Sequence, residues 1–404
     1  MNDLKALEDA YVLPTYEKFP FALERGEGCW VWDSAGTKYL DLYGGHAVAA
    51  IGHAPKEVAA AISAQAGKLL FYSNLVYVPA RAEAAKALVE FCGEKGSQVF
   101  FCNSGAEANE NAMRIARSVT GRRTVVAAEG GFHGRTAGAI SVTGSKYRKG
   151  LAGLGGDVVH VPFGDLAAAE KAIGPDTAAF LLEPIQSVQG ATTATRDYLD
   201  GLRALCEKNG ALLIFDEVQT GVGRVGARSA RHAWDVRPHL QTFAKALASG
   251  VPAGAVLAVP EVAKKVKPGE LGSTFGGGPL ACAAITATLK AVSEQKLWEN
   301  AAAMEKLIRG TFTFPQIKEI RGKGLLLGIV LDRNSKETRT ALLNRKIIVG
   351  GADDPNVIRL LPPLTVGPSE ISILRDALAD IFSAETADAA TLRAKSSTTL
   401  ALNP

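Results

Sequence analysis

Short apolar runs alternate with helical patterns through the middle of the chain, from about residue 98 to residue 260. Six of these runs are candidate strands: 99–102, 124–127, 158–161, 178–182, 212–215 and 254–259. Each is continuously hydrophobic, which is typical of strands buried on both faces of a mostly parallel sheet. Between them apolar residues recur at helical spacing, as in Leu199, Leu202 and Cys206, with Gly210 as the expected helix end. This alternation predicts an α/β fold with a large, doubly wound sheet.

The order of elements changes on both sides of this region. Beyond about residue 278, a long helical stretch, paired apolar runs around Gly324, a further helix, the run 357–361 and a last helix predict a smaller α+β domain. The first fifty residues predict an extended arm and then a hairpin over 29–32 and 38–42. We therefore divide the chain into an arm and hairpin packing with the small domain (1–50), a large domain (51–278), a small domain (279–386) and a poorly ordered tail (387–404).

Composition excludes several classes of protein. The 404 residues are 47% hydrophobic and 21% charged, which is ordinary for a folded globular protein. The net charge of +4 is too small to indicate nucleic-acid binding. The 5 cysteines are widely spaced without a CxxC pair, and the histidines lack ligand spacing, so we expect neither disulfides nor a metal site. Without an 18-residue apolar run or a signal peptide, the sequence predicts a cytoplasmic protein that does not bind membranes.

Ligands of parallel sheets gather at the carboxyl ends of the strands, so the residues that follow each run are the candidates for chemistry. Ser104, Gly105 and Ala106 follow the first run and open a helix, whose free N–H groups suit a phosphate. Ser104 and Glu107 also match an ordinary capping box, and taken alone the motif favours that interpretation.

Three further strand ends carry reactive side chains. Asp216 ends the run 212–215, where a buried carboxylate either faces a cation or caps a loop. Lys245 follows a short strand among small residues, so it is either a desolvated nucleophile or a surface lysine. The glycine-rich turn 130–136 carries Phe132, His133 and Arg135, each of which also has an ordinary role in a loop.

Together these strand ends supply a phosphate cradle, a stacking ring, an acid for a heterocyclic cation and an imine-forming amine. That set describes a site for pyridoxal 5′-phosphate. The chain resembles the class III aminotransferases, and among them the acetylornithine and ornithine branch. The resemblance covers most of the chain and rests on these motifs: Leu13-Pro-Thr-Tyr16, Asn103-Ser-Gly-Ala-Glu-Ala-Asn109, Phe132-His-Gly-Arg-Thr136, Glu183-Pro-Ile-Gln186, Asp216-Glu-Val-Gln219, Gly272-Ser-Thr-Phe-Gly-Gly277 and Ile358-Arg-Leu-Leu-Pro-Pro363.

The resemblance implies the type I fold of pyridoxal-phosphate-dependent transferases and a role for each matching residue. Lys245 would bind the cofactor covalently and then move the substrate proton, while Asp216 would pair with the ring nitrogen. Thr274 and Ser273 would reach the phosphate of a second subunit, so the resemblance implies a homodimer with shared sites. The remaining cofactor residues implied are Ser104, Gly105, Ala106, Phe132, His133, Glu183, Val218 and Gln219.

Substrate recognition in such enzymes depends on arginines, which suit carboxylates. The resemblance implies that Arg135 binds the carboxylate far from the reacting amine and that Arg359 binds the one beside it. In relatives a loop glutamate holds the second arginine when the donor lacks that carboxylate. Here the position is Val188, so Arg359 is expected to lack this partner, unless Gln189, His46 or water replaces it. Tyr16 and His46 are the remaining candidates for substrate contact, and His46 also departs from the usual aliphatic or tyrosyl residue.

The sequence therefore predicts an aminotransferase that moves an ω-amino group, with N-acetylornithine as the expected donor and 2-oxoglutarate as acceptor, in arginine synthesis. Alternative donors are ornithine, 4-aminobutyrate, a carrier-linked lysine or an α-amino acid. A non-catalytic cofactor-binding protein on the same fold is the alternative from another class, and the presence of Lys245 and Asp216 argues against it.

Overall fold

The computed structural model describes residues 2–149 and 156–400. Its largest sheet, counted over those residues, has seven strands in the order β4, β12, β11, β10, β7, β5, β6. The strands are β4 (Gln98–Cys102), β5 (Thr124–Ala128), β6 (Val158–Val161), β7 (Thr177–Leu182), β10 (Leu212–Asp216), β11 (Leu240–Phe243) and β12 (Gly254–Ala258). Only β12 runs antiparallel to its neighbours, so the six predicted strands and the mostly parallel sheet are confirmed.

Helices cover both faces of this sheet, and its strands are buried on both sides. Val125, Ala127 and Leu181 pack on one side with helix α5 (Gly105–Thr120). The intervening residues of the same strands, such as Val126, pack on the other side with α8 (Leu166–Ala172) and α9 (Arg196–Asn209). Because successive strand residues point to opposite faces, this double packing explains why the runs in the sequence are continuously apolar. Helix α9 ends at Gly210, in a left-handed conformation with φ of 66°, as the sequence predicts.

The remaining helices beside the large sheet are shorter or lie at its edge. They are α3 (Lys56–Ala66), α4 (Pro79–Phe91), α6 (Ala137–Val142), α7 (Ser145–Arg148), α10 (Ala230–Trp234), the 3₁₀-helix η1 (Lys245–Ala248) and α11 (Pro260–Ala263). The long helix α12 (Pro279–Glu294) packs against α3, α4 and η1, and it leads to the C-terminal part of the chain.

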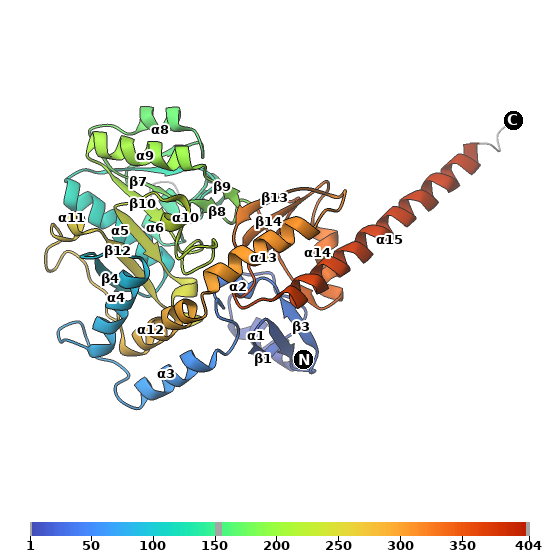
Figure 1. Cartoon of the computed structure of the whole chain (residues 1–404), viewed down its shortest axis with the longest axis horizontal. Coiled ribbons are helices and arrows are strands. Elements are labelled where there is room, and N and C mark those ends of the chain that lie inside the picture. The colour runs from blue at the N-terminus through green and yellow to red at the C-terminus, as the bar shows by residue number, and fades with distance from the viewer. Residues whose placement is uncertain (1, 150–155, 401–404) are drawn as a thin grey trace.

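Two four-stranded sheets lie beside the large one, within the residues described (Figure 1). One combines β1 (Leu23–Glu27), β2 (Trp30–Asp33) and β3 (Lys38–Asp41) with β15 (Ile347–Ile348). The other combines β13 (Ile317–Lys323), β14 (Leu326–Leu331), β16 (Gly350–Gly351) and β17 (Val357–Leu360), flanked by α13 (Leu297–Thr311), α14 (Lys336–Asn344) and α15 (Pro368–Leu400). A short pair, β8 (Ile185–Gln186) and β9 (Thr192–Thr193), completes the strands. The domain boundaries given above remain a proposal.

Both ends of the chain differ from the prediction. The arm begins with helix α1 (Asn2–Tyr11), whereas we expected extended chain there. This segment contains neither glycine nor proline, and a Lys5–Asp9 ion pair spans one of its turns. At the other end α15 continues to Leu400, so the predicted poorly ordered tail, 387–404, is helical over most of its length. Its helical part, 387–400, also lacks glycine and proline and contains several alanines, the residue with the highest helix propensity. Residues 401–404 lie outside the described part.

No helix in the described ranges is long and apolar enough to cross a membrane.

Candidate active site

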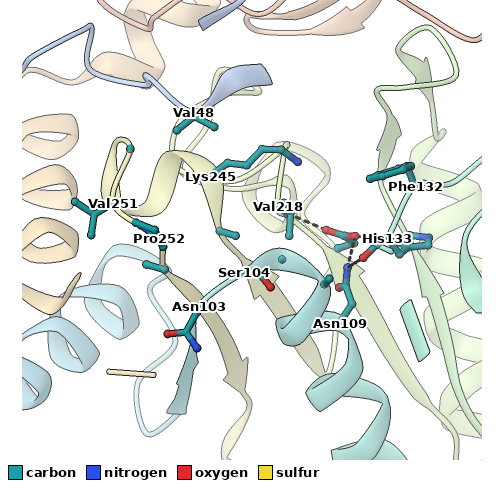
Figure 2. Close-up of a pocket in the computed structure, with 17 residues that line it drawn as sticks. Val48, Asn103, Ser104, Asn109, Phe132, His133, Val218, Lys245, Val251 and Pro252 are labelled. Carbon is teal, nitrogen blue, oxygen red and sulfur yellow. Dashed lines mark hydrogen bonds and ion pairs between the residues drawn. The ribbon is translucent and has the colours of Figure 1, made fainter. Parts of the chain in front are cut away.

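A cavity of about 320 Å³ lies where the carboxyl ends of the large sheet meet the start of α5 (Figure 2). Its walls come from several separate segments of the chain, and the residues that line it are Val48, Asn103, Ser104, Gly105, Ala106, Asn109, Phe132, His133, Gly134, Asp216, Val218, Ala244, Lys245, Gly250, Val251, Pro252 and Ala253. The sequence motifs at four strand ends therefore meet at one place, as the parallel-sheet rule predicts.

The start of α5 serves both as a cap and as a wall of the cavity. The Ser104 hydroxyl accepts a hydrogen bond from the Glu107 N–H at 3.2 Å, and the Glu107 carboxylate accepts one from the Asn103 N–H at 2.9 Å. The N–H groups of Gly105 and Ala106 belong to the first turn, where they have no partner within the helix. A side chain at Gly105 would lie 2.9 Å from the methyl groups of Val218, so only glycine lets the turn approach Val218 so closely. The capping box and an anion site thus coexist.

Asp216 is the last residue of β10 and is only 2% exposed. One carboxylate oxygen accepts hydrogen bonds from the Asn109 amide at 2.8 Å and from Nδ1 of His133 at 2.7 Å. The other oxygen accepts the Val218 N–H at 3.0 Å. With Nδ1 committed to Asp216, Nε2 of His133 is buried and has no partner among the described residues. The carboxylate is thereby held in place while it still borders the cavity.

Lys245 opens η1 immediately after β11, and its side chain borders the same cavity. Its backbone lies in the left-handed region with φ of 45°, a conformation that is uncommon for residues other than glycine and is concentrated at functional sites. Burial lowers the pKa of the Lys245 amine, while the charges of Asp216 and Glu183 oppose that change. A lysine with a lowered pKa has a larger neutral fraction, which is the nucleophilic form.

Glu183 lies behind the cavity wall and is not one of its lining residues. Its carboxylate accepts the N–H of Phe132 at 2.8 Å. Burial, and after it the negative charge of Asp216, raises the pKa of Glu183 to about 7. Glu183 therefore positions the Phe132 backbone and binds a proton more readily than an ordinary glutamate does.

Phe132 borders the cavity and is surrounded by a second group of side chains. The ring of Tyr147 packs edge-on against Phe132 with 5.1 Å between centroids. The guanidinium of Arg135, an exposed residue, lies 5.6 Å from the Phe132 ring and 5.5 Å from the Tyr147 ring. Arg135 is therefore positioned beside the cavity and free to meet an anion.

Arg359, on β17, is 7% exposed and donates hydrogen bonds to neutral groups. Its Nε donates to the Gly351 carbonyl at 2.5 Å, Nη1 to the Ser187 hydroxyl at 3.3 Å and Nη2 to the Tyr43 hydroxyl at 2.6 Å. No ion pair of Arg359 with a carboxylate occurs in the described structure. Arg359 thus has no glutamate partner among the described residues, and its partners are Tyr43, Ser187 and a backbone carbonyl in place of the Gln189, His46 or water considered from the sequence.

Several residues predicted for the site lie outside the cavity lining in the described single chain. Gln219 is buried nearby, and Ser273 Oγ accepts from the Asn103 amide at 3.2 Å. Thr274 is exposed, Tyr16 is 75% exposed, and His46 is exposed with Nδ1 2.9 Å from the Tyr43 hydroxyl. One chain thus brings together the residues for the phosphate, ring and amine, but not Tyr16 or Thr274.

Sequence reasoning assigned no role to Asn109 or Tyr43. Asn109 is 1% exposed on α5 and joins Asp216, the His133 carbonyl at 2.8 Å and the Thr242 hydroxyl at 2.8 Å. Its signal in the sequence is a polar residue on the otherwise apolar face that includes Ala108 and Ala112. Tyr43 had no such signal, because its contact with Arg359 joins residues more than 300 positions apart.

The residues present fit pyridoxal 5′-phosphate. Free N–H groups at the start of α5 suit its phosphate, Phe132 and Val218 border the space for its ring, and Asp216 offers a buried carboxylate to a ring nitrogen. Lys245 supplies an amine on the same cavity, and Figure 2 shows its side chain extending above Val218 on the side where Phe132 lies.

Comparisons with known proteins agree with this geometry. The family profile described as aminotransferase class-III matches residues 11–382. The acetylornithine aminotransferase of Methanopyrus kandleri is 42% identical over 386 residues, covering 95% of this chain and 99% of the relative. The acetylornithine aminotransferase of Streptomyces coelicolor is 42% identical over 373 residues, covering 90% of this chain and 92% of the relative.

Solved structures give the same result. An ornithine aminotransferase from Toxoplasma gondii superposes with a TM-score of 0.90 at 29% identity, covering 96% of each chain. An acetylornithine aminotransferase from Elizabethkingia anophelis superposes with a TM-score of 0.81 at 30% identity, covering 94% of this chain and 99% of the other. The chain belongs to the class III aminotransferases and is a pyridoxal-phosphate-dependent transaminase with the fold of that family.

Proposed function

We propose that this enzyme transfers the ω-amino group of N-acetylornithine to 2-oxoglutarate, giving a semialdehyde and glutamate, in the synthesis of arginine in the cytoplasm. Relatives named acetylornithine aminotransferase, 40–42% identical over most of the chain, support this donor. All five cysteines are free and buried, which is compatible with a reducing compartment. The observation that carries the proposal is that the Lys245 amine and the Asp216 carboxylate border one cavity together with Phe132 and the start of α5.

Each end of the cavity is assigned to one part of the cofactor. Ser104, Gly105 and Ala106 bind the phosphate, and Phe132 and Val218 pack against the ring. Asp216, held by Asn109 and His133, keeps the ring nitrogen protonated, while Gln219 lies near the ring hydroxyl and Glu183 supports Phe132. Pyridoxal phosphate, when bound, withdraws electrons from the bond that loses a proton. Lys245 would take that proton from the substrate carbon and carry it to C4′ of the cofactor, and the reverse transfer would serve the acceptor.

Two arginines bind the acceptor at its two carboxylates. Arg135 is exposed beside Phe132 and takes the carboxylate far from the reacting carbon. Arg359 takes the carboxylate next to it. The two charges act on the same phenol: burial and a hydrogen bond with Asp353 raise the pKa of Tyr147 to about 12, and Arg359 and Arg135 both oppose that change. One guanidinium beside Phe132 and Tyr147 and another beside Tyr43 are suited to the two carboxylates of a dicarboxylate such as 2-oxoglutarate.

A panel of amino donors with 2-oxoglutarate as acceptor tests the proposed donor. We expect the highest kcat/KM with N-acetylornithine. Ornithine is the second candidate, because a solved ornithine aminotransferase superposes with a TM-score of 0.90. A higher kcat/KM with ornithine, 4-aminobutyrate, a carrier-linked lysine or an α-amino acid would contradict N-acetylornithine, and no glutamate formed from any donor would favour a non-catalytic protein.

The covalent role of Lys245 has a direct chemical test. Borohydride reduction of the cofactor-loaded protein, followed by peptide mapping, should place a pyridoxyl group on Lys245. Lys245→Ala should lower turnover by at least roughly 10²- to 10⁴-fold, the usual contribution of a positioned proton-transfer group. Lys265→Ala, at an exposed lysine after α11, is the matched control and should retain both label and turnover. A pyridoxyl group on another lysine contradicts the assignment.

The enzyme is further proposed to be a homodimer with shared sites. Thr274 is exposed and outside the cavity lining, and the next residue, Phe275, is 64% exposed. The Phe275 ring packs on Phe71 with 5.3 Å between centroids, in a segment where Leu75 and Tyr77 are also fully or largely exposed. An apolar surface of this kind is typical of a protein interface. A second subunit on it would receive Thr274, and with it Ser273, at its own phosphate site.

Mixed dimers test the sharing of sites. Inactive Lys245→Ala subunits and Thr274→Ala subunits are combined under conditions that allow subunit exchange. If sites are shared, one site of the hybrid carries both changes and the other carries neither, so activity should recover in part. Absence of recovery after exchange has been verified would contradict the proposal.

A further inference from the structure

In the absence of substrate, Arg359 is held by three neutral hydrogen-bond acceptors. Its partners are the hydroxyls of Tyr43 and Ser187 and the carbonyl of Gly351, and Ser187 is fully buried. The guanidinium carbon also lies 5.4 Å from the centre of the Tyr43 ring. Other arginines of the fold are held in either way: Arg231 lies 2.6 Å from Glu94, whereas Arg224 donates to the carbonyls of Leu325 and Pro362. Within the described residues, Arg359 has no carboxylate partner.

The backbone around Tyr43 is shaped to deliver its hydroxyl. Gly44, Gly45, His46 and Ala47 form one left-handed turn, with φ between 57° and 65°. A left-handed turn disfavours residues with a side chain, so His46 and Ala47 retain this conformation at an energetic cost. The buried Asp41 carboxylate holds the turn by accepting the N–H groups of Tyr43 at 2.8 Å and Gly44 at 2.9 Å.

The opposite strand makes room for the Tyr43 ring. A side chain at Gly350 would lie 2.0 Å from the ring carbons of Tyr43, so any residue larger than glycine would displace the ring. Gly350 is adjacent to Gly351, whose carbonyl accepts from Arg359, and Gly350 pairs with Arg359 across the sheet. Two segments from opposite ends of the chain are thus fitted to each other at the Tyr43–Arg359 contact.

His46 completes a chain of hydrogen bonds. Its Nδ1 lies 2.9 Å from the Tyr43 hydroxyl. Burial of the covered part of the ring, and then the positive charges of Arg359 and Lys245, lower the pKa of His46, which favours a neutral ring. A neutral Nδ1 accepts the Tyr43 hydroxyl proton, and the Tyr43 oxygen is then free to accept from Arg359. This order leaves no donor facing another donor.

We propose that Tyr43, backed by His46, is a specificity-determining residue that holds Arg359 when the bound donor has no carboxylate beside its reacting carbon. The proposal rests on the proposed function, in which an ω-amine donor and glutamate use the same site in turn. With an ω-amine donor, Arg359 keeps its neutral partners and is not left unpaired. With glutamate or 2-oxoglutarate, the substrate carboxylate becomes the acceptor for Arg359 and takes the place of a neutral group.

The exchange of partners therefore favours dicarboxylates more than a resident glutamate would. Hydrogen bonds to charged groups are stronger when the acceptor is also charged and bidentate. Replacing the Tyr43 hydroxyl by a substrate carboxylate improves the bonding of Arg359, whereas replacing a resident carboxylate would leave it nearly unchanged. Tyr43 thus supports ω-amine donors by holding Arg359, but it opposes substrates with a carboxylate beside the reacting carbon less than a resident glutamate would.

The test compares single-turnover half-reactions of the holoenzyme with glutamate and with the best ω-amine donor. Tyr43→Phe should lower the ratio of kcat/KM for the ω-amine donor over glutamate by roughly tenfold or more, the cost of leaving a charged donor unpaired. His46→Ala should lower the ratio less, and His46→Asn, whose amide oxygen can replace Nδ1, should restore most of it. Tyr39→Phe is the matched control, because that hydroxyl donates to Asp33 and not to Arg359.

A binding measurement separates specificity from general damage. Calorimetric titration of the holoenzyme with glutarate, which carries both carboxylates but no amine, should show affinity equal to or higher than wild type in Tyr43→Phe. If wild type reacts with neither glutamate nor any ω-amine donor, the proposed function fails. If wild type reacts with both and Tyr43→Phe leaves the ratio unchanged, or weakens glutamate and glutarate alone, the role of Tyr43 is overturned.

Discussion

Asp216 and Glu217 are consecutive buried carboxylates at the end of β10, but they belong to different polar networks. Asp216 points toward α5, where Asn109 and His133 donate to it, and it borders the cavity. Glu217 accepts from the Ala230 N–H at 2.5 Å and the Gln241 amide at 2.7 Å. Because successive residues of a strand face opposite sides, Asp216 faces the cavity while its neighbour Glu217 faces a structural network behind the sheet.

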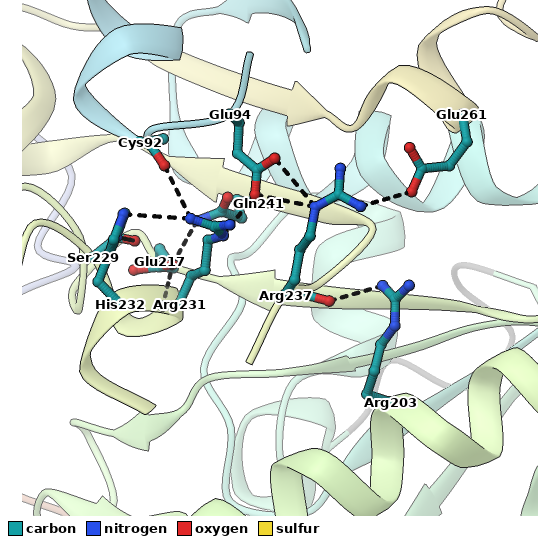
Figure 3. Close-up of polar contacts among 10 residues, drawn as sticks. All are labelled: Cys92, Glu94, Arg203, Glu217, Ser229, Arg231, His232, Arg237, Gln241 and Glu261. Atoms are coloured by element: carbon teal, nitrogen blue, oxygen red, sulfur yellow. Dashed lines mark hydrogen bonds and ion pairs between the residues drawn. The ribbon is translucent and has the colours of Figure 1, made fainter. Parts of the chain in front are cut away.

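The network on the side of Glu217 pairs its charges with one another (Figure 3). Glu94 lies 2.6 Å from Arg231 and 3.1 Å from Arg237, and Arg237 lies 3.0 Å from Glu261. In the Asp216 network, by contrast, Nε2 of His133 has no partner among the described residues, and Lys245 has no carboxylate at ion-pair distance there. Burial of an acid alone does not identify a functional site. What sets Asp216 apart is that it borders one cavity together with Lys245 and Phe132.

Exchanging each acid for its amide should separate the two networks, with the largest effect at Asp216. Asp216→Asn should lower kcat by roughly 10²- to 10³-fold, the size expected when one preorganised electrostatic contact is removed. Glu217→Gln should leave kcat within about twofold but lower the free energy of unfolding by roughly 1–3 kcal/mol, because its amide group would face N–H donors. Steady-state kinetics and denaturant titration of both variants would check this. A loss of kcat at Glu217 as large as that at Asp216 would remove the distinction.

Glu183, which lies on the cavity side of this comparison, should make the free energy of unfolding depend on pH. The pKa of its carboxyl is about 7 in the fold and near 4.5 when unfolded, so the folded state binds the proton more tightly. The contribution of Glu183 to the free energy of unfolding is therefore fully present below pH 4.5, and it is lost as pH rises through 7 and the carboxyl ionises. Glu183→Gln removes this loss. Relative to wild type, the variant should gain up to about 3 kcal/mol of unfolding free energy between pH 5 and pH 8.

This pH test is made by urea denaturation of protein freed of cofactor. Glu57→Gln, which changes an exposed carboxylate on α3, is the matched control and should show no difference between the two pH values. A pH-independent difference between Glu183→Gln and wild type would show that Glu183 titrates in the fold as it does in the unfolded chain.

The sequence predicted the large sheet because its strands are apolar on both faces, a pattern that depends on no distant contact. It missed β1, whose residues Leu23–Glu27 are mostly polar and become a strand by pairing with β2. Helix α1 was missed although Leu4, Leu7 and Tyr11 follow helical spacing, whereas the end of α15 has no apolar face that repeats at that spacing.

The site divides in the same way. Lys245, Asp216 and the start of α5 could be predicted because each follows a strand in a parallel sheet, and such ends converge. The partners of Arg359 could not, since Tyr43 and Ser187 meet it through contacts between remote segments. The absence of a glutamate at Val188 was visible in the sequence, but the compensation at Tyr43 was not.

The smallest expected effect concerns Arg359, which differs from Arg231 and Arg237 in having neutral partners. Val188 follows Ser187, whose hydroxyl is 3.3 Å from Nη1 of Arg359, so Val188→Glu would give Arg359 a carboxylate like that of Glu94. Because the neutral acceptors already satisfy the guanidinium, the added ion pair contributes only about 0.5–1.5 kcal/mol.

The ion pair exists only while no substrate carboxylate occupies Arg359, so it should favour the ω-amine donor over glutamate. At about 1.4 kcal/mol per tenfold, the ratio of kcat/KM for the ω-amine donor over glutamate should rise roughly two- to tenfold. Single-turnover half-reactions with each donor measure it, and Val188→Gln, of similar shape without the charge, should give a smaller rise. A rise of a hundredfold would mean that Tyr43, Ser187 and Gly351 do not satisfy Arg359 in the working enzyme, and an unchanged ratio would mean that a side chain at position 188 does not reach it.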